Sequence, residues 1–191
     1  MKDYSLVERA QFYTKAFPTY PPLFADGRWL SGVWLLGNNY KGNGFYGAYP
    51  PGYLKRVNAL FPDAEKALHL FSGSLPQGNY VRFDCNVLLT PDVVGEAEKL
   101  SQHFARESFD FILADPPYSA EDAKRYGTVM INRSKILREC WSVLRNDGYL
   151  GWLDTMLPMF RKTEWHLCGL ICVVRSTNHR VRLLSLFKKV G

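Results

Sequence analysis

Long apolar runs are missing from this chain. In its 191 residues, no uninterrupted hydrophobic stretch approaches the roughly 20 residues that a helix needs to cross a bilayer. The first residues, Met1 to Ser5, also lack the charged and then apolar layout of a secretory signal peptide. We therefore expect a cytoplasmic protein without a membrane partner.

Cysteine is scarce, with four in the whole chain: Cys85, Cys140, Cys168 and Cys172. Only the last two lie close together, and their spacing matches neither a redox pair nor a zinc knuckle. No second pair lies nearby to complete a tetrahedral metal site. We therefore expect free thiols in the core and no metal.

Acidic residues are outnumbered by basic ones, 18 to 24, which gives a net charge of +6. This balance favours a polyanionic partner such as nucleic acid. Basic residues crowd the C-terminal segment and also lie near a glycine-rich stretch. A solvated position on an exposed face explains any single one of them equally well. The candidate phosphate contacts are Lys41, Arg175, Arg180 and Arg182.

The length leaves little room for a second domain. With 47% hydrophobic and 22% charged residues, the composition is that of an ordinary globular protein with one core. We expect a single domain over residues 1–191, made of an N-terminal arm with a glycine-rich loop (1–45) and a core (46–191). Residues 1–17 have helical spacing, and Pro18 stops that helix.

The chain does contain alternating strand and helix patterns. Two C-terminal strands joined by a polar segment form a plausible antiparallel pair. This order predicts a doubly wound α/β fold, with a mostly parallel sheet and an antiparallel C-terminal hairpin. The strands are expected at residues 29–36, 67–71, 80–84, 109–114, 149–153, 165–174 and 181–187, and the helices at 53–61, 91–104 and 133–144.

The run at 109–114 leads directly into Asp115-Pro116-Pro117-Tyr118. Its apolar character predicts a buried central strand, which the prolines end because they cannot donate to the ladder. Asp115 and Tyr118 therefore lie at the carboxyl end of that strand, where ligands bind in open α/β sheets. An ordinary turn leaving a strand is the alternative, because Asp and Pro both favour turns.

The tetrapeptide resembles motif IV, (Asp/Asn/Ser)-Pro-Pro-(Tyr/Phe/Trp), of the S-adenosylmethionine-dependent amino-methyltransferases. These enzymes methylate the exocyclic nitrogen of adenine or cytosine, or less often a glutamine amide. The resemblance implies a Rossmann-like class I methyltransferase fold with S-adenosylmethionine as cofactor. It implies adenine N6 in DNA as the first choice of acceptor and RNA adenine as the second. A glutamine amide comes third, because the enzymes that methylate glutamine usually have Asn in place of the leading Asp.

The chemistry explains why these residue types are needed. An exocyclic amino nitrogen is a poor nucleophile because its lone pair is conjugated into the ring. By the resemblance, the Asp115 carboxylate and the Pro116 carbonyl each accept one N–H, which localises the lone pair and stabilises the growing positive charge. Pro116 and Pro117 fix the backbone that aims these groups. Tyr118 stacks on the base.

The resemblance also assigns the cofactor side. Motif I often reads Phe-x-Gly-x-Gly after the first strand, and the stretch Phe71, Ser72 and Gly73 keeps the first glycine but loses the second. Asp84 ends the second expected strand, where an acid accepts hydrogen bonds from ribose hydroxyls. Asp115 also borders the cofactor. In several of these enzymes motif X lies just before the first strand and packs against the methionine end of the cofactor. Here that position is occupied by Tyr46, Tyr49, Pro50 and Pro51.

The polar segment 119–128 is expected as a loop that closes over an extruded base, with Arg125 and Tyr126 as contacts to the target strand. We expect no separate target-recognition domain, so loops or a protein partner would supply sequence specificity. A catalytically silent methyltransferase-fold subunit that binds nucleic acid remains an alternative, because motif I is incomplete and a fold does not fix a function. A dehydrogenase is disfavoured, because the dinucleotide glycine triplet is missing.

Overall fold

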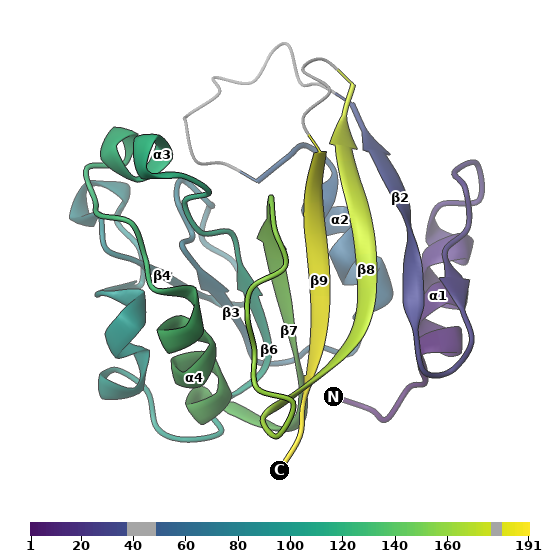
Figure 1. Ribbon diagram of the computed structural model, residues 1–191. Coiled ribbons are helices and arrows are strands. Elements are labelled where there is room, and N and C mark those ends of the chain that lie inside the picture. The colour runs from purple at the N-terminus through teal and green to yellow at the C-terminus, as the bar shows by residue number, and fades with distance from the viewer. Residues whose placement is uncertain (38–48, 177–180) are drawn as a thin grey trace.

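Nine strands form one sheet in the part of the chain that the computed structural model describes, residues 1–37, 49–176 and 181–191. Lys41, Tyr46 and Arg180, three of the predicted contact residues, lie outside these ranges. From one edge of the sheet to the other, the strands are β1 (Phe24–Ala25), β2 (Leu30–Leu36), β8 (Trp165–Arg175), β9 (Val181–Lys189), β7 (Leu144–Asp154), β6 (Phe109–Ala114), β3 (Ala67–Leu70), β4 (Val81–Asp84) and β5 (Val93–Val94) (Figure 1).

The sheet is mostly parallel. β3 to β7 run in the same direction, and β2 is parallel to β8. β9 is antiparallel to both of its neighbours, β7 and β8. The predicted α/β sheet with an antiparallel C-terminal hairpin is therefore confirmed. The hairpin does not end the sheet, however, because β2 and β1 continue it beyond β8.

Helices pack on both faces of the sheet. Along β6, Phe111 and Leu113 face a core cluster that includes side chains of two helices, whereas Ile112 and Ala114 face a second cluster. Alternate residues of a strand point to opposite faces. Among the described residues, no helix is long and apolar enough to cross a membrane. The α-helices are α1 (Leu6–Ala16), α2 (Tyr53–Leu60), α3 (Ala120–Arg125) and α4 (Arg133–Val143).

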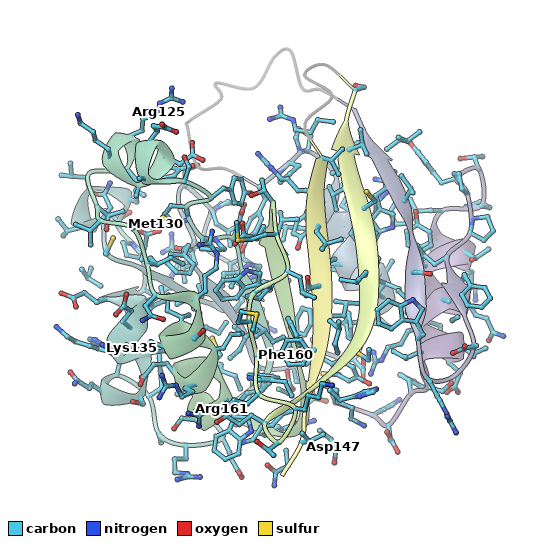
Figure 2. The ribbon with its side chains drawn as sticks, in the orientation of Figure 1. Arg125, Met130, Lys135, Asp147, Phe160 and Arg161 are labelled. Atoms are coloured by element: carbon cyan, nitrogen blue, oxygen red, sulfur yellow. The ribbon has the colours of Figure 1, made fainter. Side chains whose placement is uncertain are left out.

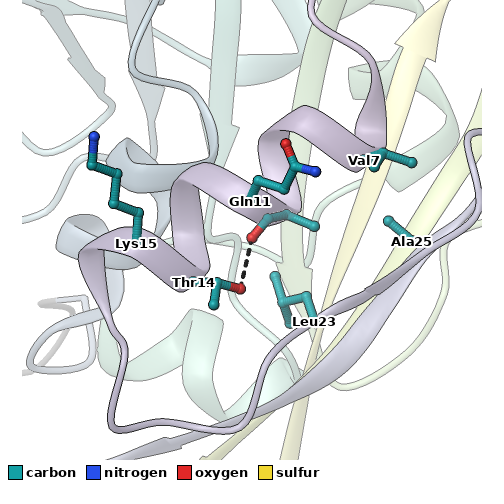
Figure 3. Close-up of a pocket in the computed structure, with 7 residues that line it drawn as sticks. Val7, Gln11, Thr14, Lys15, Leu23 and Ala25 are labelled. Atoms are coloured by element: carbon teal, nitrogen blue, oxygen red, sulfur yellow. Dashed lines mark hydrogen bonds between the residues drawn. The ribbon is translucent and has the colours of Figure 1, made fainter.

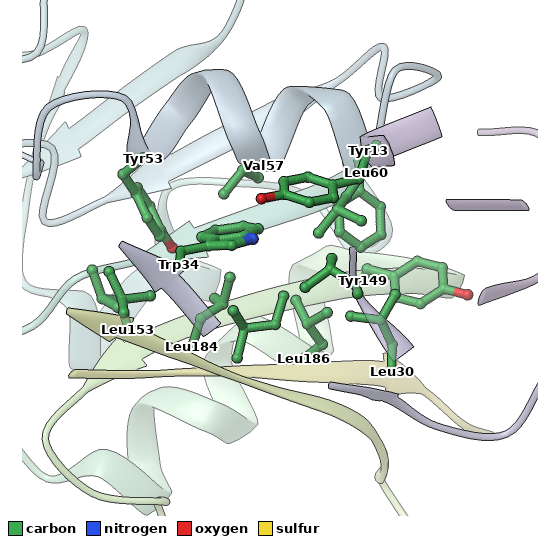
Figure 4. Close-up of a cluster of buried hydrophobic side chains, with 14 of the residues drawn as sticks. Tyr13, Leu30, Trp34, Tyr53, Val57, Leu60, Tyr149, Leu153, Leu184 and Leu186 are labelled. Carbon is green, nitrogen blue, oxygen red and sulfur yellow. The ribbon is translucent and has the colours of Figure 1, made fainter. Parts of the chain in front are cut away.

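The N-terminal segment packs as part of the core rather than as an extended arm. Ser5 caps the N-terminus of α1, because its hydroxyl accepts a hydrogen bond from the backbone N–H of Glu8, whose carboxylate accepts one from the Ser5 N–H in return. Tyr13 of α1 is buried and stacks on Trp34 of β2, with ring centroids 5.8 Å apart. Figure 4 shows this pair among the leucines of the central strands.

The helix predicted at residues 91–104 is wrong. Val93 and Val94 instead form β5, with Val93 opposite Phe83 of β4. Only a short 3-10 helix, η2 (Ala97–Gln102), follows. A Cβ atom at Gly95 would lie 2.7 Å from the Phe83 ring, so the chain passes too close to β4 for a side chain there. Adjacent β-branched residues and a glycine both disfavour a helix, and tertiary contacts with β4 decide the outcome.

Two smaller expectations also need correction. The segment 119–128, expected as a loop, contains α3, because the Ser119 hydroxyl accepts a hydrogen bond from the Asp122 N–H and caps the helix. All four cysteines are free as predicted, but Cys85 is exposed and so is not a core thiol.

Gly169→Ala should destabilise the protein, because β8 passes close to β2 at this position. A Cβ atom on Gly169 would lie 2.6 Å from the Leu30 carbonyl oxygen. Relieving that clash requires a backbone shift, and overpacking of this kind costs about 1–3 kcal/mol. Urea unfolding followed by tryptophan fluorescence measures the loss.

Gly37→Ala is the matched control, since a Cβ atom there meets no atom of the described residues within 4 Å. Its free energy of unfolding should stay within about 0.5 kcal/mol of the wild type. Equal stability of the two variants would contradict the close packing of β2 on β8.

Candidate functional site

The Asp-Pro-Pro-Tyr tetrapeptide lies where the sequence predicts it. All residues of β6 are buried, and β6 lies between β3 and β7 in the middle of the sheet. The backbone N–H of Asp115 is 3.5 Å from the Leu70 carbonyl oxygen at the end of β3. Pro116 and Pro117 are buried. The ladder therefore stops at this point, and Asp115 and Tyr118 lie at the edge where the parallel strands end, here called the carboxyl edge.

Tyr118 contacts two other groups of the site. Its hydroxyl donates a short hydrogen bond to Oδ1 of Asp115. The Arg182 guanidinium carbon lies 5.1 Å from the centroid of the Tyr118 ring, within cation–π range. One carboxylate oxygen and one ring face are thus already in contact with the protein. A planar acceptor would use the other oxygen and the other face.

The Asp115 carboxyl has an unusual ionisation. Burial raises its pKa to about 6, whereas the Arg182 charge and the Tyr118 hydrogen bond act in the opposite direction, and Asp154 raises the pKa further. At neutral pH the carboxyl is therefore mostly ionised and can accept hydrogen bonds. Burial and the neighbouring Asp115 carboxylate raise the pKa of Tyr118 well above its usual value, so its hydroxyl keeps its proton and acts as a donor.

The predicted cofactor residues at the ends of β3 and β4 meet in space. The two oxygens of Asp84 accept hydrogen bonds from the backbone N–H groups of Gly73 and Asn86, each at 2.9 Å. Phe71 and Gly73 have φ angles of 61° and 55°, which fold the chain sharply after β3. A carboxylate can accept about four hydrogen bonds, so Asp84 retains acceptor capacity beyond these two. The glycine turn and the strand-end acid thus form one unit.

Tyr49 connects the segment before α2 to β3. Its ring stacks on Tyr53 at 5.5 Å, and its hydroxyl lies 3.2 Å from Nδ1 of His69. Burial, followed by the charge of Asp115, raises the pKa of Tyr49 well above its usual value, so Tyr49 and Asp115 share one neighbourhood. Pro50 is buried and Pro51 half-buried, immediately before α2.

His69, Tyr53 and Arg133 belong to this region although the sequence did not single them out. Burial lowers the pKa of His69 to about 4, so the imidazole is neutral at physiological pH. The Tyr53 hydroxyl is buried and has no hydrogen-bond partner among the described residues. The apolar spacing of α2 predicted a buried face for that helix, but nothing local predicted which groups of other segments it would meet.

The structure places Arg133 between two strand ends. Arg133 begins α4, and its Nε donates to Oδ2 of Asp154 at 2.7 Å, while its Nη2 donates to the Tyr118 carbonyl oxygen at 3.3 Å. Asp154, the last residue of β7, is fully buried. Asp154 directly follows the strand expected at residues 149–153, but nothing in the sequence indicates its partner.

The predicted nucleic-acid contacts do not gather in one place. Arg182 lies over Tyr118, as described above. Arg175 ends β8 and is in register with Leu36 of β2, on the far side of β9 from the tetrapeptide. Figure 2 shows Arg125 at the outer end of α3. Tyr126, the C-cap residue of α3, directly follows Arg125. Direct contact with nucleic acid remains a prediction for each of these residues.

Two pockets lie elsewhere on the described surface. One, of about 440 Å³, lies between α1 and β1 and is lined by residues such as Val7, Gln11 and Leu23 (Figure 3). The other, of about 450 Å³, borders Arg133 and is lined by Met130, Met156 and Met159 among others. Neither includes Asp115 or Tyr118, so the tetrapeptide is identified as the site by its chemistry and position rather than by cavity size.

Arg182→Gln should raise the pKa of Asp115 above about 6, because the guanidinium charge favours the ionised carboxylate. A carbon-13 NMR titration of the aspartate carboxyls measures this directly and requires no substrate. Arg175→Gln is the control, because Arg175 lies on the other side of β9 and should leave the titration unchanged. An Asp115 titration that does not move in Arg182→Gln would show that the two groups are not electrostatically coupled.

Comparison with known proteins identifies the fold. Neither a protein-family model nor a curated protein matches the sequence. The crystal structure of TrmN from Thermus thermophilus is similar with a TM-score of 0.54 at 15% identity, over 75% of this chain and 50% of that chain. The aminoglycoside resistance methyltransferase NpmB1 matches with a TM-score of 0.36 at 15% identity, over 49% of this chain and 57% of that one.

The CurJ carbon methyltransferase matches with a TM-score of 0.45 at 10% identity, over 72% of this chain and 53% of that chain. The chain therefore spans about half the length of these structures, 50% to 57%. The mostly parallel sheet with its antiparallel C-terminal part has the class I methyltransferase fold.

Proposed function

We propose that this chain transfers a methyl group from S-adenosylmethionine to the exocyclic amino group of a nucleobase, with adenine N6 in DNA as the first candidate. The observation that carries the proposal is the Asp115 carboxylate at the end of the central strand. It lies beside the Tyr118 ring and in the same neighbourhood as Tyr49. This is the arrangement that amino-group methylation needs, set in a methyltransferase fold.

The residues on the cofactor side fit S-adenosylmethionine. Asp84 has acceptor capacity left for ribose hydroxyls after it binds Gly73 and Asn86. The Ser72 hydroxyl is buried without a hydrogen-bond partner among the described residues, which leaves a polar atom for a ligand. When bound, the cofactor supplies an electrophilic methyl group on a positively charged sulfur. Tyr49, Pro50 and Pro51 would border its methionine end.

The acceptor side follows from the tetrapeptide. The second carboxylate oxygen of Asp115, Oδ2, and the Pro116 carbonyl would each accept one N–H of the amino group, which directs the nitrogen lone pair away from the ring. The negative charge of Asp115 stabilises the cation that forms at the nitrogen. That cation must then lose one proton, which the Asp115 carboxylate, with a pKa of about 6, is placed to accept. The face of the Tyr118 ring opposite Arg182 would stack on the base.

The alternative to an enzyme is a catalytically silent subunit that binds nucleic acid. Its support is the incomplete motif I, in which Phe71-Ser72-Gly73-Ser74-Leu75 lacks the second glycine. Binding of S-adenosylmethionine separates the two proposals, since a silent subunit should not bind it. RNA adenine is the alternative acceptor for an active enzyme.

Asp115→Ala should reduce methyl transfer by on the order of 100-fold or more, because it removes the charge that stabilises the reacting nitrogen. The assay follows labelled methyl from S-adenosylmethionine into parallel samples of double-stranded DNA, single-stranded DNA, RNA and protein. Label in one kind of nucleic acid that disappears with the variant identifies the enzyme and its acceptor.

Cofactor affinity of Asp115→Ala, measured by calorimetry, should stay within a few-fold of the wild type. Loss of binding would show that Asp115 maintains the fold instead of acting on the acceptor. Transfer to none of the four acceptors, together with no cofactor binding by the wild type, would favour the silent subunit.

Tyr118→Ala should lower kcat/KM more than Tyr118→Phe, because only the alanine variant loses the ring. Aromatic stacking on a base contributes about 1–3 kcal/mol, which is on the order of 5- to 150-fold in kcat/KM. Tyr118→Phe removes the hydroxyl bond to Asp115 but keeps the stacking face, so it is the matched control. Steady-state kinetics on the acceptor identified above measure both, and equal losses would contradict stacking.

A further inference from the structure

Three segments that are far apart in the sequence meet at the carboxyl edge through one arginine. Arg133 Nε donates to Asp154 Oδ2 at 2.7 Å, and Nη2 lies 3.4 Å from Oδ1 of the same carboxylate. The same Nη2 donates to the Tyr118 carbonyl oxygen at 3.3 Å. Arg133 thus joins the start of α4, the end of β7 and the tetrapeptide that follows β6.

The carboxylate of this pair is held from several sides. Asp154 is fully buried, and besides Arg133 it accepts hydrogen bonds from the Trp152 indole N–H at 3.2 Å and the Thr155 backbone N–H at 2.7 Å. A buried ion pair is weak evidence for stability, because desolvation offsets much of the attraction. It does fix the direction of the guanidinium, since a carboxylate with these partners has little freedom to move.

The fixed guanidinium acts on the tetrapeptide backbone. The carbonyl that Arg133 holds belongs to Tyr118, whose ring is the proposed stacking face and whose hydroxyl bonds to Asp115. The two prolines before Tyr118 restrict rotation at their own φ angles, but they do not fix the peptide that follows Tyr118. Arg133 supplies that missing constraint.

We propose that Arg133 and Asp154 form a positioning pair, which holds the peptide of Tyr118 so that the Asp115 carboxylate and the Tyr118 ring face the acceptor together. This inference rests on the proposed methyl transfer. Neither residue touches the reacting atoms in it. A displacement of about 1 Å in such a site can reduce turnover on the order of 100-fold, so the loss of one arginine contact is measurable in kcat.

The chain contains a matched pair far from the site. Arg9 of α1 donates to Asp63 at 2.9 Å and to the Leu60 carbonyl oxygen at 3.1 Å, and both side chains of this ion pair are buried. This arginine also joins a buried aspartate to a backbone carbonyl. Its ring neighbours are Tyr4, Phe61 and Tyr149 rather than any group of the tetrapeptide. Arg9→Lys therefore reports the effect of losing such a contact on stability alone.

Arg133→Lys keeps the charge beside Asp154 but loses the planar fork that reaches two acceptors at once. It should lower kcat by on the order of 10- to 100-fold, while the acceptor KM and the cofactor Kd remain within a few-fold of the wild type. Arg9→Lys should leave kcat unchanged, even if both variants lower the melting temperature. Steady-state kinetics, calorimetry and thermal unfolding on the three proteins give these values.

A pH profile of kcat tests a second property of the pair, its electrostatic coupling to Asp115, which a role confined to stability would not produce. Arg182 on β9, Tyr118 and Asp154 on β7 shift the pKa of Asp115. The charge of Asp115 in turn raises the pKa of Tyr49 and of Tyr53. Asp154→Asn removes a negative charge, which lowers the pKa of Asp115 and moves the acid limb of the profile to lower pH. Arg133→Lys keeps both charges and should leave that limb in place.

The outcomes distinguish this inference from the proposed function. In the first case the wild-type enzyme transfers methyl, but Arg133→Lys retains its kcat or loses it only in parallel with Arg9→Lys. This result overturns the positioning pair and leaves the methyltransferase proposal standing. An acid limb that stays in place in Asp154→Asn overturns the coupling of the pair to Asp115. A wild-type protein that methylates none of the four acceptors overturns the proposed function, and with it the role of the pair in turnover.

Discussion

The parallel alignment of β3, β6 and β7 is the constraint on which the proposed site depends. Because these neighbouring strands run in one direction, the chain leaves all of them at the same edge of the sheet. The glycine turn after β3, the tetrapeptide after β6 and Asp154 at the end of β7 are thereby brought together, although long stretches of sequence separate them. The two core clusters on opposite faces hold this alignment.

The sequence was sufficient for features with local causes. The apolar run 109–114 followed by two prolines predicts a buried strand that ends at Asp115, and the structure has β6 at Phe109–Ala114. The order of the strands in the chain predicts the parallel sheet, and the polar break near residue 178 predicts the final hairpin. The structure also brings the Gly73 turn and the acid at Asp84 into direct contact, as their shared place after neighbouring strands suggests.

Features with distant causes were not predictable in this way. Residues 91–104 carry acidic and apolar positions at helical intervals. Val93 and Val94 nevertheless form a strand that pairs with β4, and the close packing of Gly95 on Phe83 leaves no room for a helix. Arg133 has no local signal at all, because its partners Asp154 and Tyr118 come from other strand ends. A single sequence records the residue but not the pairing, which only the folded sheet creates.

The two ends of the sheet have a consequence for association between molecules. An exposed edge strand presents unpaired backbone groups that can template another chain. Here the long hairpin strands β8 and β9 are enclosed because β2 pairs along β8, and the sheet ends in β1 and β5, each of two residues. Such short edges offer few adjacent donors and acceptors. Another chain would therefore find few backbone groups to pair with at β1 or β5, whereas residues 32–36 of β2 extend beyond β1 and have no partner strand on that side among the described residues.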